Sequence, residues 1–467
     1  MRNAATETLL STVSTTGMAL TEDAFAEYMD NADPLREHRN AYHIPPMRDG
    51  TPFSYLVGNS LGPQHVGVEA AVAGFLKKWR DQGCEGHAMQ PNPWNEADQT
   101  YIKDMASLVG AKDAEVAIMN SLTVNLHLLL TAFYRPQLTK KKIMIEHKSF
   151  PSDTYAMISQ LESRGMNPAE DLITVTAPGT KSYDEPATVI PTEAFLAAID
   201  KHGDDTAVLV ISAVHFLTGQ LFDIPTIVKA AHAKNILVGV DCAHAVGNVP
   251  LQLHEWEVDF ACWCTYKYLN SGPGNIGAIF VHSKHTSTTT PLKYLKGWWG
   301  NDMKTRFTPH RSFEPAAGAS AFQLSMPSAA SCMMLGPSLK LMASVGLPAI
   351  RQKSLLLTAY LELLCTELVP PGCIEIITPA DPNQRGAQLS IRLLPNKLKS
   401  SELDSAAYEI GTAAEGTDDA SILQRQLLDE GIMIDKRPPD VVRVAPAPMY
   451  NNFTDVLRAV RTIAESF

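Results

Sequence analysis

Short apolar runs alternate with longer segments of helical periodicity between about residues 60 and 282. Parallel strands that are buried on both faces of a sheet give continuous apolar runs, and the helices that connect them cover the two faces. We therefore predict an α/β fold in which a large domain holds a mainly parallel seven-stranded sheet. The predicted strands span residues 116–119, 143–146, 172–175, 207–212, 237–241, 260–264 and 276–281. The predicted helices between them span residues 97–109, 123–132, 153–161, 191–201 and 225–234, and residues 150–153 supply candidate caps for the third.

A different pattern begins after residue 290. Stretches rich in glycine, proline and aromatic residues, 291–300 and 309–327, precede a long helical segment, 328–368, with interruptions predicted near Gly336-Pro337 and Gly346. Further strands are predicted at 373–377, 387–393 and 441–445, and further helices at 421–430 and 454–466. This is the pattern of a smaller α+β C-terminal domain. We expect a large domain (55–330), a small domain (331–467) with an exposed insertion at 400–417, and an N-terminal segment (1–54) that packs with the small domain.

The overall charge limits the classes of partner. The 467 residues include 39 Lys and Arg and 50 Asp and Glu, a formal net charge of −11, which disfavours a protein that binds nucleic acid or an anionic membrane. No segment reaches the ~18 apolar residues of a membrane span, and the acidic first thirty residues differ from a targeting peptide. Seven scattered cysteines without zinc-ligand spacing indicate reduced thiols and no metal site. We expect a cytoplasmic protein that binds a small molecule.

Two charged residues stand where apolar strands end. Asp241 follows the run 236–240, and Lys267 comes one helix-plus-strand unit later, just after the strand 260–264. Ligands of open α/β sheets bind at the carboxyl edge of the strands. Pyridoxal phosphate (PLP) needs a lysine that forms a Schiff base and a carboxylate that pairs with its protonated pyridine nitrogen. A solvent-exposed lysine and a helix-capping aspartate are the simpler alternatives, but capping does not account for the spacing of the two residues.

The segment 120–125 is a candidate phosphate site. It follows the strand 116–119 and begins a helix, so that backbone amides and the Thr123 hydroxyl lie at the positive end of a helix dipole. An ordinary capped helix start has the same local pattern. The chain has no Gly-x-Gly-x-x-Gly or Walker pattern at this point, which counts against a nucleotide.

Eight sequence blocks carry a resemblance to a known family. From about Arg36 to Phe453 the chain resembles the kynureninases, which are fold type I PLP enzymes of the class V aminotransferase-like superfamily. The blocks, in chain order, are 58–62 (GNSLG), 122–128 (LTVNLHL), 150–153 (FPSD), 214–220 (VHFLTGQ), 241–244 (DCAH), 266–270 (YKYLN), 297–300 (GWWG) and 443–448 (RVAPAP). The resemblance implies hydrolysis of L-kynurenine, its 3-hydroxy form or a ring-modified kynurenine to the matching anthranilate and L-alanine. It further implies a place in tryptophan catabolism and NAD biosynthesis through the kynurenine pathway, and a cytoplasmic homodimer with active sites at the subunit interface.

The resemblance also implies roles for single residues. Lys267 is expected to form the Schiff base, Asp241 to pair with the pyridine nitrogen, and Tyr266 to relay protons as the third catalytic residue. Tyr266 and Trp298 resemble phosphate ligands, with Trp298 reaching across from a second subunit. The other expected cofactor contacts are Leu122, Thr123, Phe150, Pro151, Ser152, Asp153, Ser212 and His244. Taken singly, His244 and Phe150 are as well explained as core residues, and Trp298 as a surface or interface aromatic.

The expected substrate contacts are Ser60, His87, Asn301, Met326 and Arg443. Arg443 corresponds to the arginine that holds the α-carboxylate, and among apolar neighbours such a side chain needs an anionic partner. Two positions depart from the family pattern, because Asn301 stands in place of the usual histidine and Met326 in place of an asparagine. Loss of the amide at Met326 removes hydrogen-bonding capacity and adds flexible apolar surface. Our hypothesis is that the reaction is kept and the accepted aryl group is altered; neutral drift is the alternative.

Two other functions remain open on the sequence alone. A cysteine desulfurase-like lyase of the same fold would also keep Asp241, His244 and Lys267, but it needs a reactive cysteine on a mobile loop, and Cys332 and Cys365 lie in helical patterns. A non-catalytic protein that uses the PLP fold for binding is disfavoured by the presence of Lys267, Asp241 and Arg443, which are costly to bury without a function.

Overall fold

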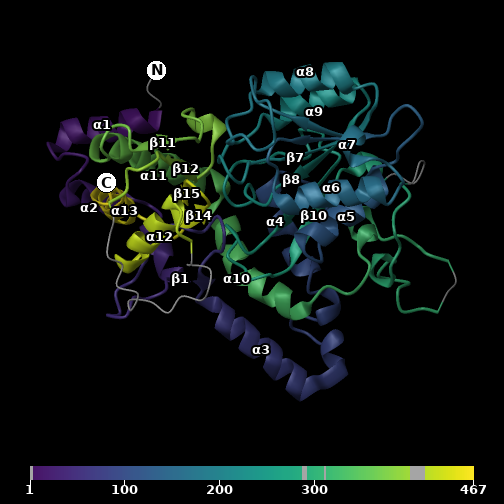
Figure 1. The fold of residues 1–467 in the computed structure, drawn as a ribbon. Helices are drawn as coiled ribbons and strands as arrows, with labels where there is room; N and C mark the ends of the chain where they lie inside the picture. Colours follow the sequence, from purple (N-terminus) through teal and green to yellow (C-terminus); the bar gives the residue numbers. More distant parts are fainter. Residues whose placement is uncertain (1–3, 287–291, 310–311, 400–415) are drawn as a thin grey trace. The chain divides into compact units, whose positions relative to one another are not determined.

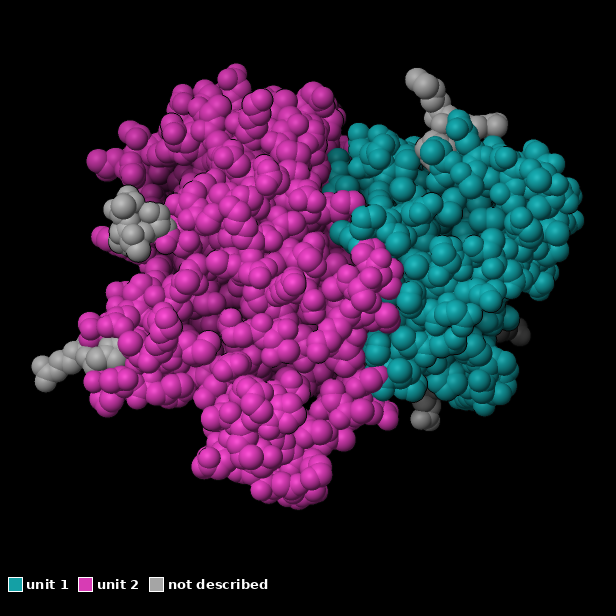
Figure 2. Space-filling model, turned by 180° about the vertical axis from the view of Figure 1, so that it is seen from behind, with its two compact units in different colours: residues 1–66, 217–221, 347–467 teal, residues 67–216, 222–346 magenta. Residues whose placement is uncertain are grey.

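The computed structural model describes residues 4–286, 292–309, 312–399 and 416–467 (Figure 1). The chain folds into two compact units (Figure 2). Unit 1 comprises residues 1–66, 217–221 and 347–467, and unit 2 comprises residues 67–216 and 222–346. The division near the C-terminal side falls at residue 346, not at the expected residue 330, because helix α10 (Ala329–Val345) packs on α3 (Gly67–Gln82) and α4 (Ile102–Val109) of unit 2.

Unit 2 is built on a seven-stranded sheet with the strand order β4-β10-β9-β8-β7-β5-β6. All strands are parallel except β10, which runs antiparallel to β9 and β4. The strands are Val116–Ile118 (β4), Lys142–Glu146 (β5), Leu172–Val175 (β6), Thr206–Ser212 (β7), Leu237–Asp241 (β8), Phe260–Cys264 (β9) and Gly277–Val281 (β10). Each lies within one residue of its predicted bounds, so the predicted α/β class with a mainly parallel sheet is confirmed.

Helices α5 (Leu122–Phe133) and α6 (Pro151–Glu162) cover one face of this sheet (Figure 1). Their apolar side chains form one buried cluster with alternate residues of β5, β7, β9 and β10. At its centre the ring of Phe133 stacks on that of Phe260 with centroids 4.6 Å apart. The remaining helices of the βα region are α7 (Pro168–Asp171), α8 (Thr192–His202) and α9 (Ile224–Ala233), of which α8 and α9 pack on each other.

Unit 1 contains a four-stranded antiparallel sheet with the order β11-β12-β15-β14. Its strands are Ile374–Ile376 (β11), Leu389–Leu393 (β12), Asp435–Arg437 (β14) and Val441–Val444 (β15). Its helices are α1 (Ala4–Thr16), α2 (Asp23–Ala32), α11 (Leu347–Leu368), α12 (Asp419–Asp429) and α13 (Phe453–Glu465). The buried face of α13 packs on α11 and α2. Short strand pairs join β1 (Tyr42–His43) to β3 (Gln64–His65) and β2 (Ser54–Tyr55) to β13 (Ile432–Met433).

Several local expectations need correction. The helical segment 328–368 is interrupted at Gly346, which has a φ of 83°, but α10 continues through Pro337. Gly336 has a packing role there, since a Cβ at this position would lie 2.4 Å from the Tyr101 hydroxyl. Helix α3 was missed although its apolar residues Val68, Val72, Phe75 and Trp79 recur at helical spacing, and Val68 is the one residue of this helix that is buried. Of the predicted insertion 400–417, residues 400–415 lie outside the described residues.

Within the described part of the chain, no single helix is long and apolar enough to cross a membrane. Among the described residues, one bent pair, α10 and α11 joined across the break at Gly346, meets the criterion of length and composition when the two helices are taken together.

The side chain of Asp259, at the amino end of β9, binds three other segments of unit 2: α9, β8 and the segment that follows β10. It is 1% exposed and immediately precedes β9. Its Oδ2 accepts hydrogen bonds from His232 Nε2 (2.8 Å) and the backbone N–H of Val238 (2.7 Å), while its Oδ1 faces His285 Nε2 (2.7 Å) and Lys284 Nζ (2.9 Å). Burial alone would raise the pKa of this carboxyl, but the four partners together lower it far below its ordinary value. Asp259 is therefore a buried, ionised residue that stabilises the folded state.

Replacement of this carboxylate by an amide (D259N) should lower the free energy of unfolding by about 3–5 kcal/mol at pH 7, because basic partners lose their counterion. A depressed folded-state pKa contributes stability above the unfolded pKa of ~4, and this contribution is lost as the pH falls below it. Urea unfolding at pH 7 and pH 3.5 should show that the difference between wild type and D259N shrinks in acid. The control is D200N, because Asp200 is 87% exposed and lies 3.9 Å from Lys234. An equal loss at both pH values would contradict this account.

Candidate active site

A pocket lies at the carboxyl ends of β7, β8 and β9, entirely within unit 2. The free space between its side chains is about 480 Å³, including the part open to solvent. Three of its lining residues, Val214, Phe216 and Ala243, were not predicted. The other nine are residues that the sequence predicts as cofactor contacts: Leu122, Thr123, Phe150, Ser152, Ser212, Asp241, His244, Tyr266 and Lys267.

Lys267 projects into this pocket from the loop after β9. Its Nζ lies 2.9 Å from Nε2 of His244 and 5.8 Å from the centroid of the Phe150 ring. The Phe150 ring also meets Phe216 edge to face, with centroids 5.2 Å apart. Lys267 is half-buried and His244 is buried, so the alternative of a lysine that merely projects into solvent does not describe this side chain.

Two carboxyl groups, those of Asp153 and Asp241, lie close together beside the lysine. Asp241 ends β8 and its Oδ1 accepts a hydrogen bond from the backbone N–H of Ala243 at 2.8 Å. Asp153 lies in the first turn of α6, is 1% exposed and bonds with the carboxyl of Asp241. Burial and the charge of Asp241 raise the pKa of Asp153 well above its ordinary value, against the smaller opposite effect of Lys267. Burial beside a second carboxyl group therefore favours the protonated form of Asp153.

Two helices begin at the pocket. Helix α5 begins at Leu122 and α6 at Pro151, and the hydroxyl groups of their second residues, Thr123 and Ser152, lie 2.6 Å apart. The prediction that residues 150–153 cap α6 with a side chain is wrong, because Phe150 is the cap residue and makes no side-chain cap bond. The positive ends of two helix dipoles, with the two hydroxyl groups beside them, form a site suited to an anion.

Tyr266 lines the pocket and is held protonated. Burial, followed by the neighbouring Cys264, raises the pKa of its phenol above the ordinary value. Pro151 and Trp298, predicted as cofactor contacts, do not line the pocket. Pro151 occupies the first position of α6, where its fixed φ favours a helix start. Trp298 is 56% exposed, and its indole N–H donates a hydrogen bond to the carbonyl of Arg306 at 2.8 Å.

These groups fit each part of PLP. The amine of Lys267 can bond to the aldehyde carbon of PLP, and the Asp153–Asp241 pair can offer a buried negative charge to the pyridinium nitrogen. Thr123 and Ser152 provide hydroxyl groups for the phosphate, and Phe150 provides an aromatic face for the ring. Asp153 Oδ1 is buried without a hydrogen-bond partner among the described atoms, as expected for a group that awaits a ligand.

The predicted substrate residues of unit 2 lie outside the pocket lining. His87 is exposed and meets the Trp94 ring edge to face, with centroids 5.3 Å apart. Asn301 is buried and its amide is engaged locally, because Nδ2 donates to Thr305 Oγ1 (3.1 Å) and Oδ1 accepts from the backbone of Glu314 (2.8 Å). Met326 is half-buried in the segment before α10. Asn301 thus stabilises its own loop.

In unit 1, Arg443 is fully buried on β15, and its anionic partner is Asp435 on the neighbouring β14. The ion pair is bidentate: Nε donates to Oδ1 at 2.9 Å, and a terminal nitrogen lies 2.8 Å from Oδ2. Asp435 also pairs with Arg437. Sequence reasoning missed Asp435 because β14 is short, polar and half-buried, and therefore lacks the apolar alternation that marks a strand. Ser60 is half-buried, and its backbone N–H donates to Val57.

Glu146 is a second residue that sequence reasoning missed. It ends β5 as Asp241 ends β8, and it is 1% exposed. Both the hydroxyl and the backbone N–H of the pocket residue Ser212 donate hydrogen bonds to its Oε1, at 2.7 and 3.2 Å. The signal was present in the sequence, since a carboxylate at the end of an apolar run is the same pattern that singled out Asp241.

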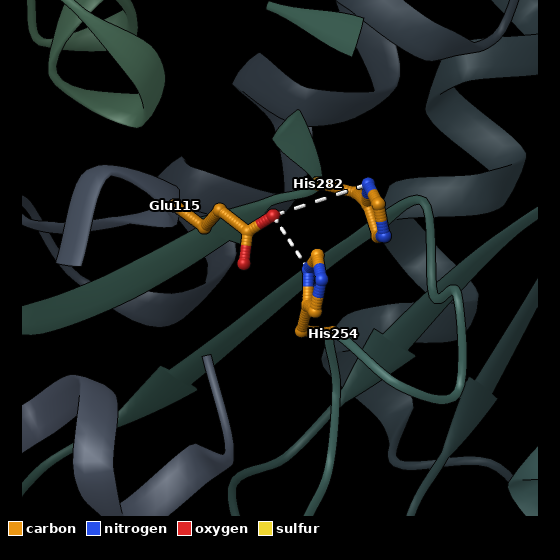
Figure 3. Close-up of side chains that lie close together, drawn as sticks. All are labelled: Glu115, His254 and His282. Atoms are coloured by element: carbon orange, nitrogen blue, oxygen red, sulfur yellow. Dashed lines mark hydrogen bonds and ion pairs between the residues drawn. The ribbon is translucent and has the colours of Figure 1, made fainter. Parts of the chain in front are cut away.

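A cluster of possible metal ligands lies outside the pocket (Figure 3). Glu115 Oε1 accepts a hydrogen bond from His254 Nδ1 at 2.9 Å and lies 3.9 Å from His282 Nδ1. The two imidazole rings are stacked, with centroids 4.7 Å apart and planes at 18°, so their in-plane lone pairs run nearly parallel instead of converging on one ion. The backbone N–H groups of Ser283 and Lys284 also bond to Glu115 Oε1 and His282 Nδ1. The cluster acts as a hydrogen-bonded connection between segments that flank β4 and β10.

Two family models match the chain. The model described as "Aminotransferase class-V" matches residues 74–393, and that described as "Kynureninase C-terminal domain" matches residues 412–463. Among solved structures, the chain resembles the cysteine desulfurase CsdA from Escherichia coli (TM-score 0.67, 15% identity, 92% of this chain and 98% of that one). It also resembles a C-DES variant with glycine covalently linked to its PLP cofactor (TM-score 0.66, 14% identity, 87% and 96%). At these identities the likeness establishes the fold, in agreement with the predicted fold type I architecture.

Curated relatives are much more similar in sequence. The chain is 43% identical to a kynureninase of Coccidioides immitis (92% of this chain and 91% of the relative), 40% identical to one of Nematostella vectensis (99% and 97%) and 42% identical to one of Myxococcus xanthus (94% and 96%). Identity at this level over nearly the full length of both chains, together with the two family models, means that the chain belongs to the kynureninase family.

Proposed function

We propose that this protein is a PLP-dependent hydrolase that cleaves L-kynurenine, or a ring-substituted kynurenine, to the matching anthranilate and L-alanine. The observation that carries the proposal is the pocket in which Lys267, the Asp153–Asp241 pair and the Thr123–Ser152 hydroxyl groups meet. Membership of the kynureninase family supports the choice of substrate.

When bound, PLP supplies an electron sink that weakens the bonds at the substrate's Cα and lets the β,γ carbon–carbon bond break. With PLP bound, Lys267 would hold the cofactor, and its Nζ, once freed by the amine of the substrate, would accept the Cα proton. His244, 2.9 Å away, fixes the position of Nζ. The Asp153–Asp241 pair keeps one negative charge at the pyridine nitrogen, which stabilises the protonated ring.

Tyr266 is assigned to proton relay. Its raised pKa keeps the phenol O–H intact at neutral pH, so that it can donate a proton to the carbon that becomes the alanine methyl group. Water adds to the γ-carbonyl carbon, and the bond that breaks leaves the carboxylate on the aryl product. The overall reaction consumes one water and releases anthranilate and alanine.

Arg443 is the residue we assign to the α-carboxylate of the substrate. Asp435 holds one edge of its guanidinium in a bidentate pair, which fixes the plane of the fork. A planar, preoriented fork is the arrangement that recognises a carboxylate through two parallel hydrogen bonds.

The desulfurase alternative has less support. Its representatives are 14–16% identical to this chain, whereas the kynureninases are 40–43% identical. Cys332 and Cys365 are buried in α10 and α11, and burial raises the pKa of both thiols to about 12. Sulfide release from cysteine by the purified protein would favour the desulfurase.

We also propose a cytoplasmic homodimer. Helix α3 exposes two large apolar side chains, Leu76 (52%) and Trp79 (60%), and Trp298 is 56% exposed. Such surface is typical of a subunit interface. Sedimentation of the holoenzyme should give twice the mass of one chain, and charge at the interface (L76E/W79E) should shift it to the monomer. A wild-type monomer at micromolar concentration would overturn this proposal.

Removal of the lysine amine tests the assigned chemistry. K267A should lose the visible absorption of lysine-bound cofactor and reduce the hydrolysis of kynurenine by about 10²- to 10⁴-fold or more, because both the covalent anchor and the base are lost. The measurement is the fluorescence of released anthranilate in the presence of added PLP. The control is K229A, which removes an exposed lysine of α9. If borohydride still fixes PLP covalently to K267A at a single site, the assignment of Lys267 fails.

We make a further proposal about which substituents the enzyme accepts on the aromatic ring of the substrate. Met326 replaces the asparagine of the family pattern, and Asn301 already uses its amide within its own loop, so neither offers a hydrogen bond to a ring hydroxyl. We expect no preference of the wild type for 3-hydroxykynurenine over kynurenine or ring-alkylated kynurenines. M326N should raise the relative kcat/KM for 3-hydroxykynurenine by about fivefold, the effect of one hydrogen bond of about 1 kcal/mol. M326L is the matched apolar control, and a clear wild-type preference for the 3-hydroxy substrate would refute the idea.

A further inference from the structure

Glu146 is a buried carboxyl group that none of the steps above uses. It ends β5, whose neighbours in the sheet are β7 and β6. Ser212, at the end of β7, donates to Glu146 Oε1 through its hydroxyl (2.7 Å) and through its backbone N–H (3.2 Å). Since Ser212 lines the pocket, Glu146 acts on the pocket through Ser212.

Neutral hydrogen-bond donors surround the carboxyl group of Glu146. Among the residues that the structure describes, no basic side chain forms an ion pair with it. Besides Ser212, the hydroxyl of Ser149 and the backbone of Glu146 itself act on the carboxyl as donors, while its Oε2 is buried without a hydrogen-bond partner in the described chain. A buried carboxylate without a cation is costly, and burial raises the pKa of Glu146.

The charge of the neighbouring groups gives a second, independent reason. Asp153 is acted on by the charges of both Glu146 and Asp241, and Lys267 is the positive group that opposes them. Three ionised carboxyl groups would place three negative charges against one amine in a buried site. One negative charge on the Asp153–Asp241 pair is sufficient to balance a protonated pyridine nitrogen, so a charge on Glu146 would be unbalanced.

We propose that Glu146 is a positioning residue of the cofactor site, a neutral carboxylic acid that accepts the hydroxyl proton of Ser212 and leaves the negative charge of the pocket to Asp153 and Asp241. A serine hydroxyl has one proton to donate, so Ser212 then presents only lone pairs to a ligand in the pocket. This inference rests on the proposed PLP site and adds a residue that acts through Ser212.

The first experiment detects the proton itself. E146Q keeps the size of the side chain and the acceptor for Ser212 but removes the carboxylic acid. The infrared difference spectrum between wild-type and E146Q holoenzyme at pH 7 should contain the C=O stretch of a protonated carboxylic acid. The matched control is E115Q, because Glu115 is equally buried but hydrogen bonds from Lys112, Ser283 and His254 outweigh burial and lower its pKa. E115Q should remove the bands of an ionised carboxylate, and the same result for E146Q would overturn the proposal.

The second experiment separates positioning from packing. The pH at which the visible absorbance of bound cofactor changes should be the same in E146Q and wild type, because no charge is removed. Loss of a negative charge would instead lower this apparent pKa, which would contradict a neutral Glu146. E146A deprives the Ser212 hydroxyl of its acceptor and should speed cofactor release from the holoenzyme about 2- to 10-fold. In a double-mutant cycle, E146A should have no further effect in S212A; fully additive effects would show packing alone.

These tests fail separately from the proposed function. Neither uses kynurenine, so a wild type that binds PLP without releasing anthranilate would refute the proposed reaction while the Glu146 result stands. Conversely, if the enzyme is active but Glu146 gives the infrared bands of an ionised carboxylate, the proposed function stands and the proposal of a neutral Glu146 is refuted.

Discussion

The parallel pairing of β5, β7, β8 and β9 determines where each reactive group of this protein lies. Ser212 pairs with Asp241 across β7 and β8, and Asp241 pairs with Cys262 across β8 and β9. Parallel strands all end at the same edge, so side chains that follow different strands meet there although helices separate them in sequence. The apolar cluster beneath α5 and α6 keeps these strands in register. Backbone hydrogen bonds of the sheet therefore position the pocket more rigidly than loops alone would.

The charge and kind of the groups around each buried carboxyl contribute to whether its pKa is lowered or raised. Asp259 has two imidazoles, an ammonium group and a backbone amide, and it keeps its charge. Glu115 has backbone amides and His254, and its pKa is also lowered. Asp153 instead faces another carboxyl, and its pKa is raised. The fold thus lowers the pKa of carboxyl groups that connect segments and raises the pKa of Asp153 beside the pocket.

Much of this arrangement could be predicted from the sequence, for identifiable reasons. The seven strands of unit 2 are continuous apolar runs, and polar residues such as Asp241 at their ends predict an active edge. Segments whose stability comes from tertiary contacts were missed. Helix α3 was missed although its apolar residues recur at helical spacing. The polar strand β14 is formed by pairing with β15, so the Asp435–Arg443 pair was not foreseen. Helix α10 continues through Pro337, although local helix propensity alone predicts that the helix is interrupted there.

The meeting of α5 and α6 at Thr123 and Ser152 has a mechanical consequence. The starts of the two helices carry the same partial positive charge and repel each other. An anion bound between them would attract both helix starts. A bound phosphate would then attract both helix starts and hold together two helices whose apolar faces form part of the core. Tight binding of the phosphate would therefore also hold α5 and α6 in place on the face of the sheet that they cover.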